Sequence, residues 1–165
     1  FVVAHIPTEL VRKALPFILL ALVIYTLCKK QFGQTHNPLL SGTKEKVAAI
    51  LIGSAVGFYD GLFGPGTGSF LIFLFIKFFG YDFLRASAIS KVINVATNLA
   101  ALIWFSYSGH ILWQLGLMMA VFNVLGALVG SRLAIKYGSG FVRILFIIVV
   151  CVLIVKTSYD AFFKV

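Results

Sequence analysis

Acidic side chains are scarce in this sequence, and charged side chains of either sign are few. Five Asp and Glu stand against 14 Lys and Arg in 165 residues. Charged residues make up 12% of the chain, about half the share found in soluble proteins, while hydrophobic residues make up 61%. Such a composition excludes an ordinary soluble domain and predicts an integral protein of the lipid bilayer.

Cysteine and histidine are also rare, and their positions exclude further classes of protein. Cys28 and Cys151 fall within apolar runs, where they are expected to be small hydrophobic residues rather than a disulfide framework. His5, His36 and His110 are too scattered for a zinc site, so we expect no metal and no cofactor. The net charge of +9 comes from Lys and Arg between apolar runs, which indicates contact with anionic lipid and no nucleic-acid partner.

Apolar runs recur along the whole chain and predict an all-α, polytopic bundle of membrane helices. Spans are expected at residues 10–28, 83–107, 111–136 and 141–163. Residues 31–46 form a polar linker, and the lysines around it (Lys29, Lys30, Lys44 and Lys46) predict a cytoplasmic location.

Residues 57–69 interrupt the apolar pattern with five glycines, a proline and an aspartate. We expect this segment to be non-helical, and such backbone is tolerated in a bilayer only when it is buried in protein or lines a watery cavity. The arms at 47–58 and 69–79 are each only about 17 Å long, roughly half of the hydrocarbon core. This length favours a re-entrant hairpin with its tip near the midplane, although a broken helix that crosses the membrane stays open.

The distribution of basic residues distinguishes these two topologies. A hairpin gathers most Lys and Arg on one face of the membrane, whereas a crossing divides them almost evenly. Because cytoplasmic loops are enriched in Lys and Arg, the hairpin is favoured. The residues gathered on that face are Lys29, Lys30, Lys44, Lys46, Lys77, Arg85, Arg132, Lys136 and Arg143.

The span at 83–107 has an unusually polar face. Ser87, Lys91, Asn94 and Asn98 follow one another at helical spacing, with Lys91 about 12 Å from the start of the helix. An ionisable side chain at this depth indicates a functional site. The alternatives are a lysine that extends to the membrane surface, or a structural ion pair between Lys91 and Asp60.

The glycine segment is the expected partner of this polar face, and together they predict an anion site. The arm that begins near Ser69 presents unpaired N–H groups and the positive end of a helix dipole. The predicted binding residues are Gly64, Gly66, Thr67, Gly68, Ser69, Lys91, Asn94 and Asn98. Asp60 is expected either to brace Lys91 or to carry a proton that couples to transport.

Two further features concern packing and duplication. Gly126 and Gly130 form a GxxxG motif that predicts close packing against another helix; a homo-oligomer stays open. Asn123 is expected in an interhelical hydrogen bond, with a place in the cavity as the alternative. The pattern at residues 10–25 resembles that at 141–156, with an offset of 131 residues. Such an internal repeat is typical of transporters. With this repeat, the chain is expected to consist of the last helix of a truncated first repeat (1–30), the linker (31–46) and a second four-segment repeat (47–165).

These motifs resemble the TauE/SafE family of membrane permeases. The resemblance rests on the segment 57–69, on Lys91-Val92-x-Asn94, on the motif from Gly126 to Arg132 and on Val142-Arg143. It implies a two-repeat permease of the bacterial cytoplasmic membrane, with inverted repeats, that carries sulfite, a sulfonate or another sulfur-containing anion. The chain is similar to the C-terminal two-thirds of such a permease.

The expected function is therefore secondary transport of a small anion, without enzymatic activity. One alternative is a structural membrane subunit or a truncated remnant that does not transport. A second alternative is an intramembrane hydrolase with Ser69 as nucleophile and His110 as base, which requires both side chains within hydrogen-bond reach.

Overall fold

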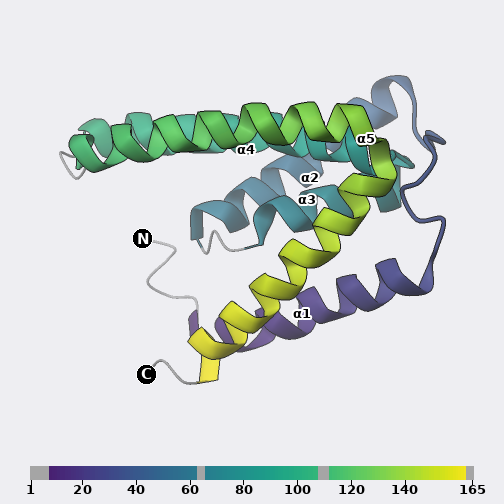
Figure 1. Ribbon diagram of the computed structural model, residues 1–165, viewed down its shortest axis with the longest axis horizontal. Helices are drawn as coiled ribbons and strands as arrows, with labels where there is room; N and C mark the ends of the chain where they lie inside the picture. The colour runs from purple at the N-terminus through teal and green to yellow at the C-terminus, as the bar shows by residue number, and fades with distance from the viewer. Residues whose placement is uncertain (1–7, 63–65, 108–111, 163–165) are drawn as a thin grey trace.

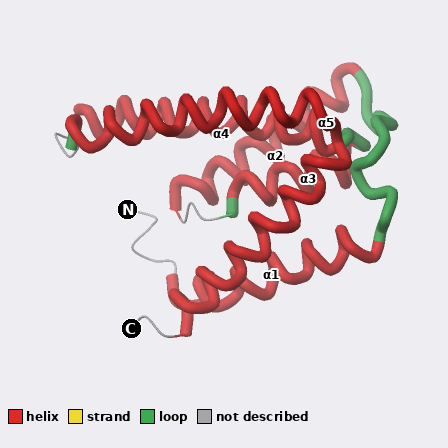
Figure 2. Tube along the Cα trace, viewed as in Figure 1, coloured by secondary structure: helices red, strands yellow, loops and turns green. Residues whose placement is uncertain are grey.

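All regular elements that the structure describes are helices, as the sequence predicts (Figures 1 and 2). The structure is a computed structural model, and it describes residues 8–62, 66–107 and 112–162. The helices are α1 (Thr8–Cys28), α2 (Gly42–Leu62), α3 (Thr67–Phe79), α4 (Phe83–Tyr107) and α5 (Trp113–Phe162). Of these, α4 and α5 are long and apolar enough to cross a membrane.

The helix α5 is bent at Gly138 into two arms. Gly138 has φ of 71° and ψ of −168°. This conformation lies outside the helical region, and glycine adopts it more readily than other residues. The first arm runs beside α4, and the second arm turns back to pack against α1 (Figure 1). The two spans predicted at 111–136 and 141–163 are therefore present as the two arms of one bent element.

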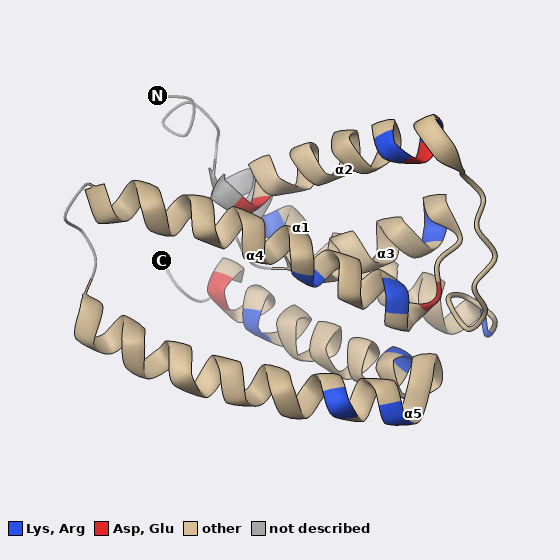
Figure 3. Ribbon diagram, turned by 90° about the horizontal axis from the view of Figure 1, so that it is seen from above, with Lys and Arg blue, Asp and Glu red and all other residues tan. Residues whose placement is uncertain are grey.

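One end of the molecule collects the connections between helices, and we call it the basic end. There α1 ends, α2 begins, α3 ends, α4 begins and α5 bends (Figure 1). The N–H of Asn37 donates to the carbonyl of Gly80 at 2.9 Å, and the N–H of Phe83 donates to that of Gly33 at 2.8 Å. Most Lys and Arg residues of the described chain gather at this end (Figure 3).

Arg143 joins the second arm of α5 to the end of α1. Its guanidinium donates to the carbonyls of Thr26 at 2.6 Å and Lys29 at 3.1 Å, and also to that of Lys30. The last carbonyls of a helix have no partner within the helix and carry its partial negative charge, so a cation there stabilises the end. Because α1 ends where the second arm begins, these two helices run antiparallel.

Helices α2 and α3 form the predicted hairpin. The hydroxyl of Tyr81, just after α3, donates to the carboxylate of Glu45 in the first turn of α2. The outer ends of both helices therefore lie at the basic end, and the tip lies inside the bundle. The linker is shorter than expected, because α2 begins at Gly42 and so residues 42–46 are helical. Glu45 explains this extension, since an acidic side chain in the first turn favours the helix.

The expectation that residues 57–69 are non-helical throughout is wrong. Helix α2 continues to Leu62 and α3 begins at Thr67. A glycine lowers helix stability by only about 1 kcal/mol, which the intrahelical hydrogen bonds can offset in apolar surroundings. The glycines instead allow α4 to approach: a Cβ at Gly57 would lie 3.3 Å from Cγ2 of Thr97, and one at Gly68 would lie 3.4 Å from Nδ2 of Asn94.

The buried core lies between α1, α3, the start of α4 and the second arm of α5. Its fully buried side chains are mostly large and apolar: Leu19, Leu71, Phe75, Phe79, Phe83 and Val150. By contrast, the rest of α4 and the first arm of α5 expose most of their apolar side chains. Apolar exposure of this extent fits contact with lipid or with further membrane helices.

Candidate functional site

The hairpin tip lies beside the middle of α4. Gly68 of α3 faces Asn94, and Gly57 of α2 faces Thr97. These two α4 residues lie on either side of Val95, the midpoint of the 25-residue helix. The tip therefore lies at the level of the middle of α4, and its predicted position near the membrane midplane stays a prediction.

Helix α3 begins at the tip without a side-chain cap. Gly66 precedes the helix in a left-handed conformation with φ of 87°, which favours glycine, and no side chain caps this end. The first hydrogen bond of the turn runs from the N–H of Phe70 to the carbonyl of Gly66 at 3.0 Å. The partial positive charge of the helix dipole lies at this end of α3.

Asp60, in the last turns of α2, connects three helices at the tip. One of its carboxylate oxygens accepts a hydrogen bond from the hydroxyl of Thr67 on α3 at 2.7 Å. The other oxygen accepts one from the hydroxyl of Thr97 on α4 at 3.1 Å. The carboxylate oxygens of Asp60 are therefore bound by two threonine hydroxyls, and not by Lys91 as one of the two expectations had it. Sequence spacing alone could not show this, because the contacts join residues on three different helices.

A cavity of about 470 Å³ opens at this point, and we call it the tip pocket. Its polar lining comes from the end of α2, the start of α3 and the face of α4, and its apolar wall comes from the second arm of α5. The polar lining consists of Asp60, Gly66, Thr67, Gly68, Ser69, Ser87 and Asn94. Five of the eight predicted binding residues, together with Asp60, therefore line one pocket. Gly64 lies outside the described residues.

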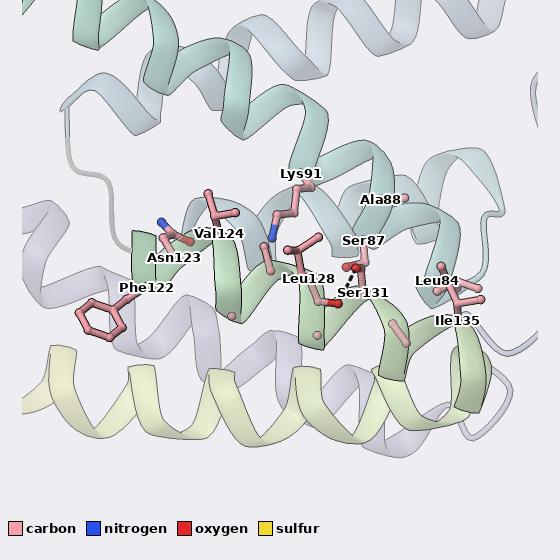
Figure 4. A pocket seen from close by; sticks show the side chains of 14 residues that line it. Leu84, Ser87, Ala88, Lys91, Phe122, Asn123, Val124, Leu128, Ser131 and Ile135 are labelled. Atoms are coloured by element: carbon pink, nitrogen blue, oxygen red, sulfur yellow. Dashed lines mark hydrogen bonds between the residues drawn. The ribbon is translucent and has the colours of Figure 1, made fainter. Parts of the chain in front are cut away.

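Lys91 lines a different cavity, of about 830 Å³, which we call the Lys91 cavity (Figure 4). This cavity lies between α4 and the first arm of α5, and its polar side chains are Ser87, Lys91, Asn123 and Ser131. A smaller cavity of about 570 Å³ joins Lys91 to Asn94, Asn98 and Asn123. The predicted polar face of α4 is therefore present, but part of it faces the tip pocket at α3 and part of it faces the first arm of α5.

The expected close packing of the GxxxG motif is not found in the described chain. A Cβ built at Gly126 or Gly130 meets nothing within 4 Å, and both glycines line the Lys91 cavity. Asn123 lines the same cavity, which was the alternative to the expected interhelical hydrogen bond. The available signal was the spacing of Asn123, three and seven residues before the two glycines and so on their helical face, but spacing does not specify which helix that face meets.

Two other expectations concern chemistry at histidine and metal sites. Ser69 is buried at the start of α3, but His110 lies outside the described residues. Within the parts of the chain that the structure describes, no group of three or more His, Cys, Asp and Glu could hold a metal ion.

These observations define a helical membrane protein with a polar site at the tip of an internal hairpin. The sequence model of the family described as "Sulfite exporter TauE/SafE" matches residues 1–157. The chain belongs to this family.

Similar curated proteins are named as membrane transporters. "Probable membrane transporter protein ORF9" of Sinorhizobium sp is 35% identical over 155 residues, which cover 94% of this chain and 59% of that protein. "Probable membrane transporter protein YfcA" of Escherichia coli strain K12 is 32% identical over 160 residues, covering 96% and 58%. A "Probable membrane transporter protein" of Haemophilus influenzae is 32% identical over 162 residues, covering 96% and 61%. The chain thus spans about three fifths of these relatives. No solved structure matches it.

Proposed function

We propose that this chain forms the substrate-binding part of a secondary transporter that moves a small anion across the bacterial cytoplasmic membrane. The observation that carries the proposal is the position of the start of α3, where residues 66–69 line the tip pocket beside the middle of α4. The N-terminal end of a helix that is interrupted near the membrane midplane attracts anionic groups. The names of the similar proteins support the same class of function.

Lys91 adds a full positive charge close to this pocket. It precedes Asn94 by three residues on α4, and the two residues share the smaller cavity with Asn98. A lysine in the middle of a membrane helix is costly unless it has a partner or a function. We propose that Lys91 attracts the anion and that Asn94 and Asn98 bind it as it reaches residues 66–69.

Asp60 opposes anion binding while it is ionised, and this gives it a role in coupling. Two threonine hydroxyls offset part of its charge. Protonation would remove the remaining charge and one hydrogen-bond acceptor, so that the tip pocket becomes more attractive to an anion. We propose that Asp60 takes up a proton when the substrate binds.

The substrate class follows from the family alone. Its description names sulfite export, so sulfite, a sulfonate or another sulfur-containing anion is the proposed cargo. The proposed inverted repeat has support of its own, because corresponding helices of inverted repeats run antiparallel. Helix α1 and the second arm of α5 are antiparallel and packed together, as expected for the last helices of a first repeat and of the repeat at 47–165.

The proposal is tested by uptake of radiolabelled sulfite into proteoliposomes that contain the purified protein. Lys91→Ala is expected to lower uptake at least tenfold, whereas Lys91→Arg keeps the charge and part of the activity. Lys77→Ala is the matched control, because Lys77 lies in the last turn of α3 and donates to Tyr25 away from these cavities.

Wild-type uptake no greater than that of empty liposomes would contradict anion transport and favour a structural subunit. Wild-type uptake that Lys91→Ala leaves unchanged would refute the role of Lys91. Labelling of Ser69 by a fluorophosphonate probe would instead indicate the hydrolase alternative.

A further inference from the structure

The Lys91 cavity is separate from the tip pocket and has its own set of polar side chains. Lys91 and Ser87 come from α4, one turn apart, and Asn123 comes from the first arm of α5. In Figure 4 the side chain of Lys91 extends from α4 toward α5, with Asn123 to one side and Ser87 to the other. None of the described residues that line this cavity is acidic.

These side chains are suited to an anion. The ammonium of Lys91 has three N–H donors, the amide of Asn123 has two, and the hydroxyl of Ser87 has one. Ser131 also lines the cavity, but its hydroxyl donates to the carbonyl of Leu128 at 3.1 Å, so we do not count it as a ligand. The cavity of about 830 Å³ is in the range of small-molecule sites.

Glycines make the floor of the cavity. A Cβ at Gly126 or Gly130 would meet nothing within 4 Å, so the space above them is not occupied by another part of the described chain. A small-residue motif alone would indicate helix packing. Lys91 and Ser87 on the neighbouring α4 distinguish this motif, since a packed helix would have to desolvate the ammonium of Lys91.

The Lys91 cavity and the tip pocket are neighbours that share part of their walls. Ser87 of α4 lines both of them, and so do Gly130 and Ala134 of α5. Gly130 has no side chain and Ser87 and Ala134 have small ones, so the junction is formed by small residues from two helices. These small residues are the shortest boundary between the exposed Lys91 side and residues 66–69 of the tip pocket.

We propose that Lys91, Asn123 and Ser87 form a second anion station, and that Ser87 and Gly130 form the passage from it to the tip pocket. This inference rests on the proposed transport function and adds the first arm of α5 to the path. The station without acidic residues receives the anion first. The anion then passes to the tip pocket, where Asp60 is located.

The passage is tested by filling it with a side chain at Gly130. Gly130→Leu is expected to lower sulfite uptake into proteoliposomes at least tenfold. Gly116→Leu is the matched control: it lies on the same arm, a Cβ there also meets nothing within 4 Å, and it lines neither cavity. Circular dichroism and gel filtration of both variants establish that they fold.

The station is tested by substitutions that remove or replace the amide of Asn123, with sulfite binding as the measurement. Asn123→Ala is expected to weaken sulfite binding about tenfold, the effect of losing one hydrogen bond to a charged ligand. Asn123→Asp should weaken it further, because a carboxylate repels the anion.

Equal uptake by the Gly130→Leu and Gly116→Leu variants would overturn the passage, whether both are active or both inactive. Unchanged sulfite binding in Asn123→Ala and Asn123→Asp would overturn the station. In both cases active wild-type protein shows that the proposed transport function itself stands. Wild-type protein that neither binds nor transports sulfite would overturn the inference together with the function.

Discussion

Removal of the Asp60 carboxylate should lower the free energy of unfolding, and the hydrogen bonds at the hairpin tip set the size of the loss. Its two oxygens bind hydroxyls from α3 and α4, so Asp60→Ala removes contacts between three helices. Hydrogen bonds between membrane helices average about 0.6 kcal/mol in double-mutant cycles, and bonds to charged groups in proteins reach about 3 kcal/mol. Each of the two bonds should fall within these limits.

Geometry ranks the two bonds. The Thr67 bond is 2.7 Å long, as expected for a hydroxyl that donates to an ionised carboxylate, and we assign it about 2 kcal/mol. The Thr97 bond is 3.1 Å long, and the same hydroxyl can donate to the carbonyl of Asn94, also at 3.1 Å. Since Thr97 has this second acceptor, we assign its bond with Asp60 about 1 kcal/mol. Asp60→Ala should then cost about 3 kcal/mol, and Asp60→Asn, which keeps one acceptor, clearly less.

The assay is reversible unfolding in mixed micelles, followed by circular dichroism. Two double-mutant cycles combine Asp60→Ala with Thr67→Val and with Thr97→Val, and their coupling energies should be near 2 and 1 kcal/mol respectively. Thr26→Val is the control, because its hydroxyl donates to Leu22 within α1, and coupling with Asp60 should be below about 0.5 kcal/mol. A coupling energy for Thr97 that equals or exceeds that for Thr67 would refute this reasoning, and so would additivity in both cycles.

Two further predictions concern the basic end. Gly80 and Gly42 both have positive φ, but a Cβ at Gly80 would lie 1.9 Å from the carbonyl oxygen of Asn37, whereas one at Gly42 meets nothing within 4 Å. Gly80→Ala should therefore destabilise the protein by at least about 1 kcal/mol more than Gly42→Ala in the same unfolding assay, and equal losses would contradict this. Burial, together with the hydrogen bond to Glu45, raises the pKa of Tyr81 from 10.0 to about 12, so the folded state favours the neutral phenol. Its contribution to stability should be complete below pH 10 and be lost as the pH rises toward about 12, and Tyr81→Phe should flatten this part of the curve of unfolding free energy against pH.

Features that depend on local sequence could be predicted closely. The span predicted at 83–107 coincides with α4, because an apolar run ends at Tyr107 and Asp82 caps its start by accepting from the N–H of Arg85 at 2.8 Å. The bend at Gly138 follows equally from a glycine between two apolar runs. The hairpin topology came from the positions of the basic residues, whereas the predicted length of its first arm was wrong, because α2 extends over 21 residues, Gly42–Leu62.

The sequence predicted most residues of the candidate site, but it predicted only some of the contacts between them. Helical spacing correctly placed Lys91, Asn94 and Asn98 on one face of α4. It could not show that this face is divided between the tip pocket and the Lys91 cavity, because the division depends on where α3 and α5 cross α4. The same limit applies to Asp60, whose expected partner on α4 was Lys91 and whose actual partner there is Thr97.

The sequence by itself determined that the chain is a helical membrane protein, where most of its helices lie and which residues are too polar for lipid. These properties depend on local free energies: the length of an apolar run, the helix propensity of each residue and the cost of an unpaired polar group in hydrocarbon. Only the tertiary structure decided that Gly57 and Gly68 remain helical and lie against α4, that two threonines hold Asp60, and that Gly126 and Gly130 face an open cavity opposite Lys91. Contacts between distant helices depend on crossing angles and relative heights, and a local pattern of residues does not fix either of them.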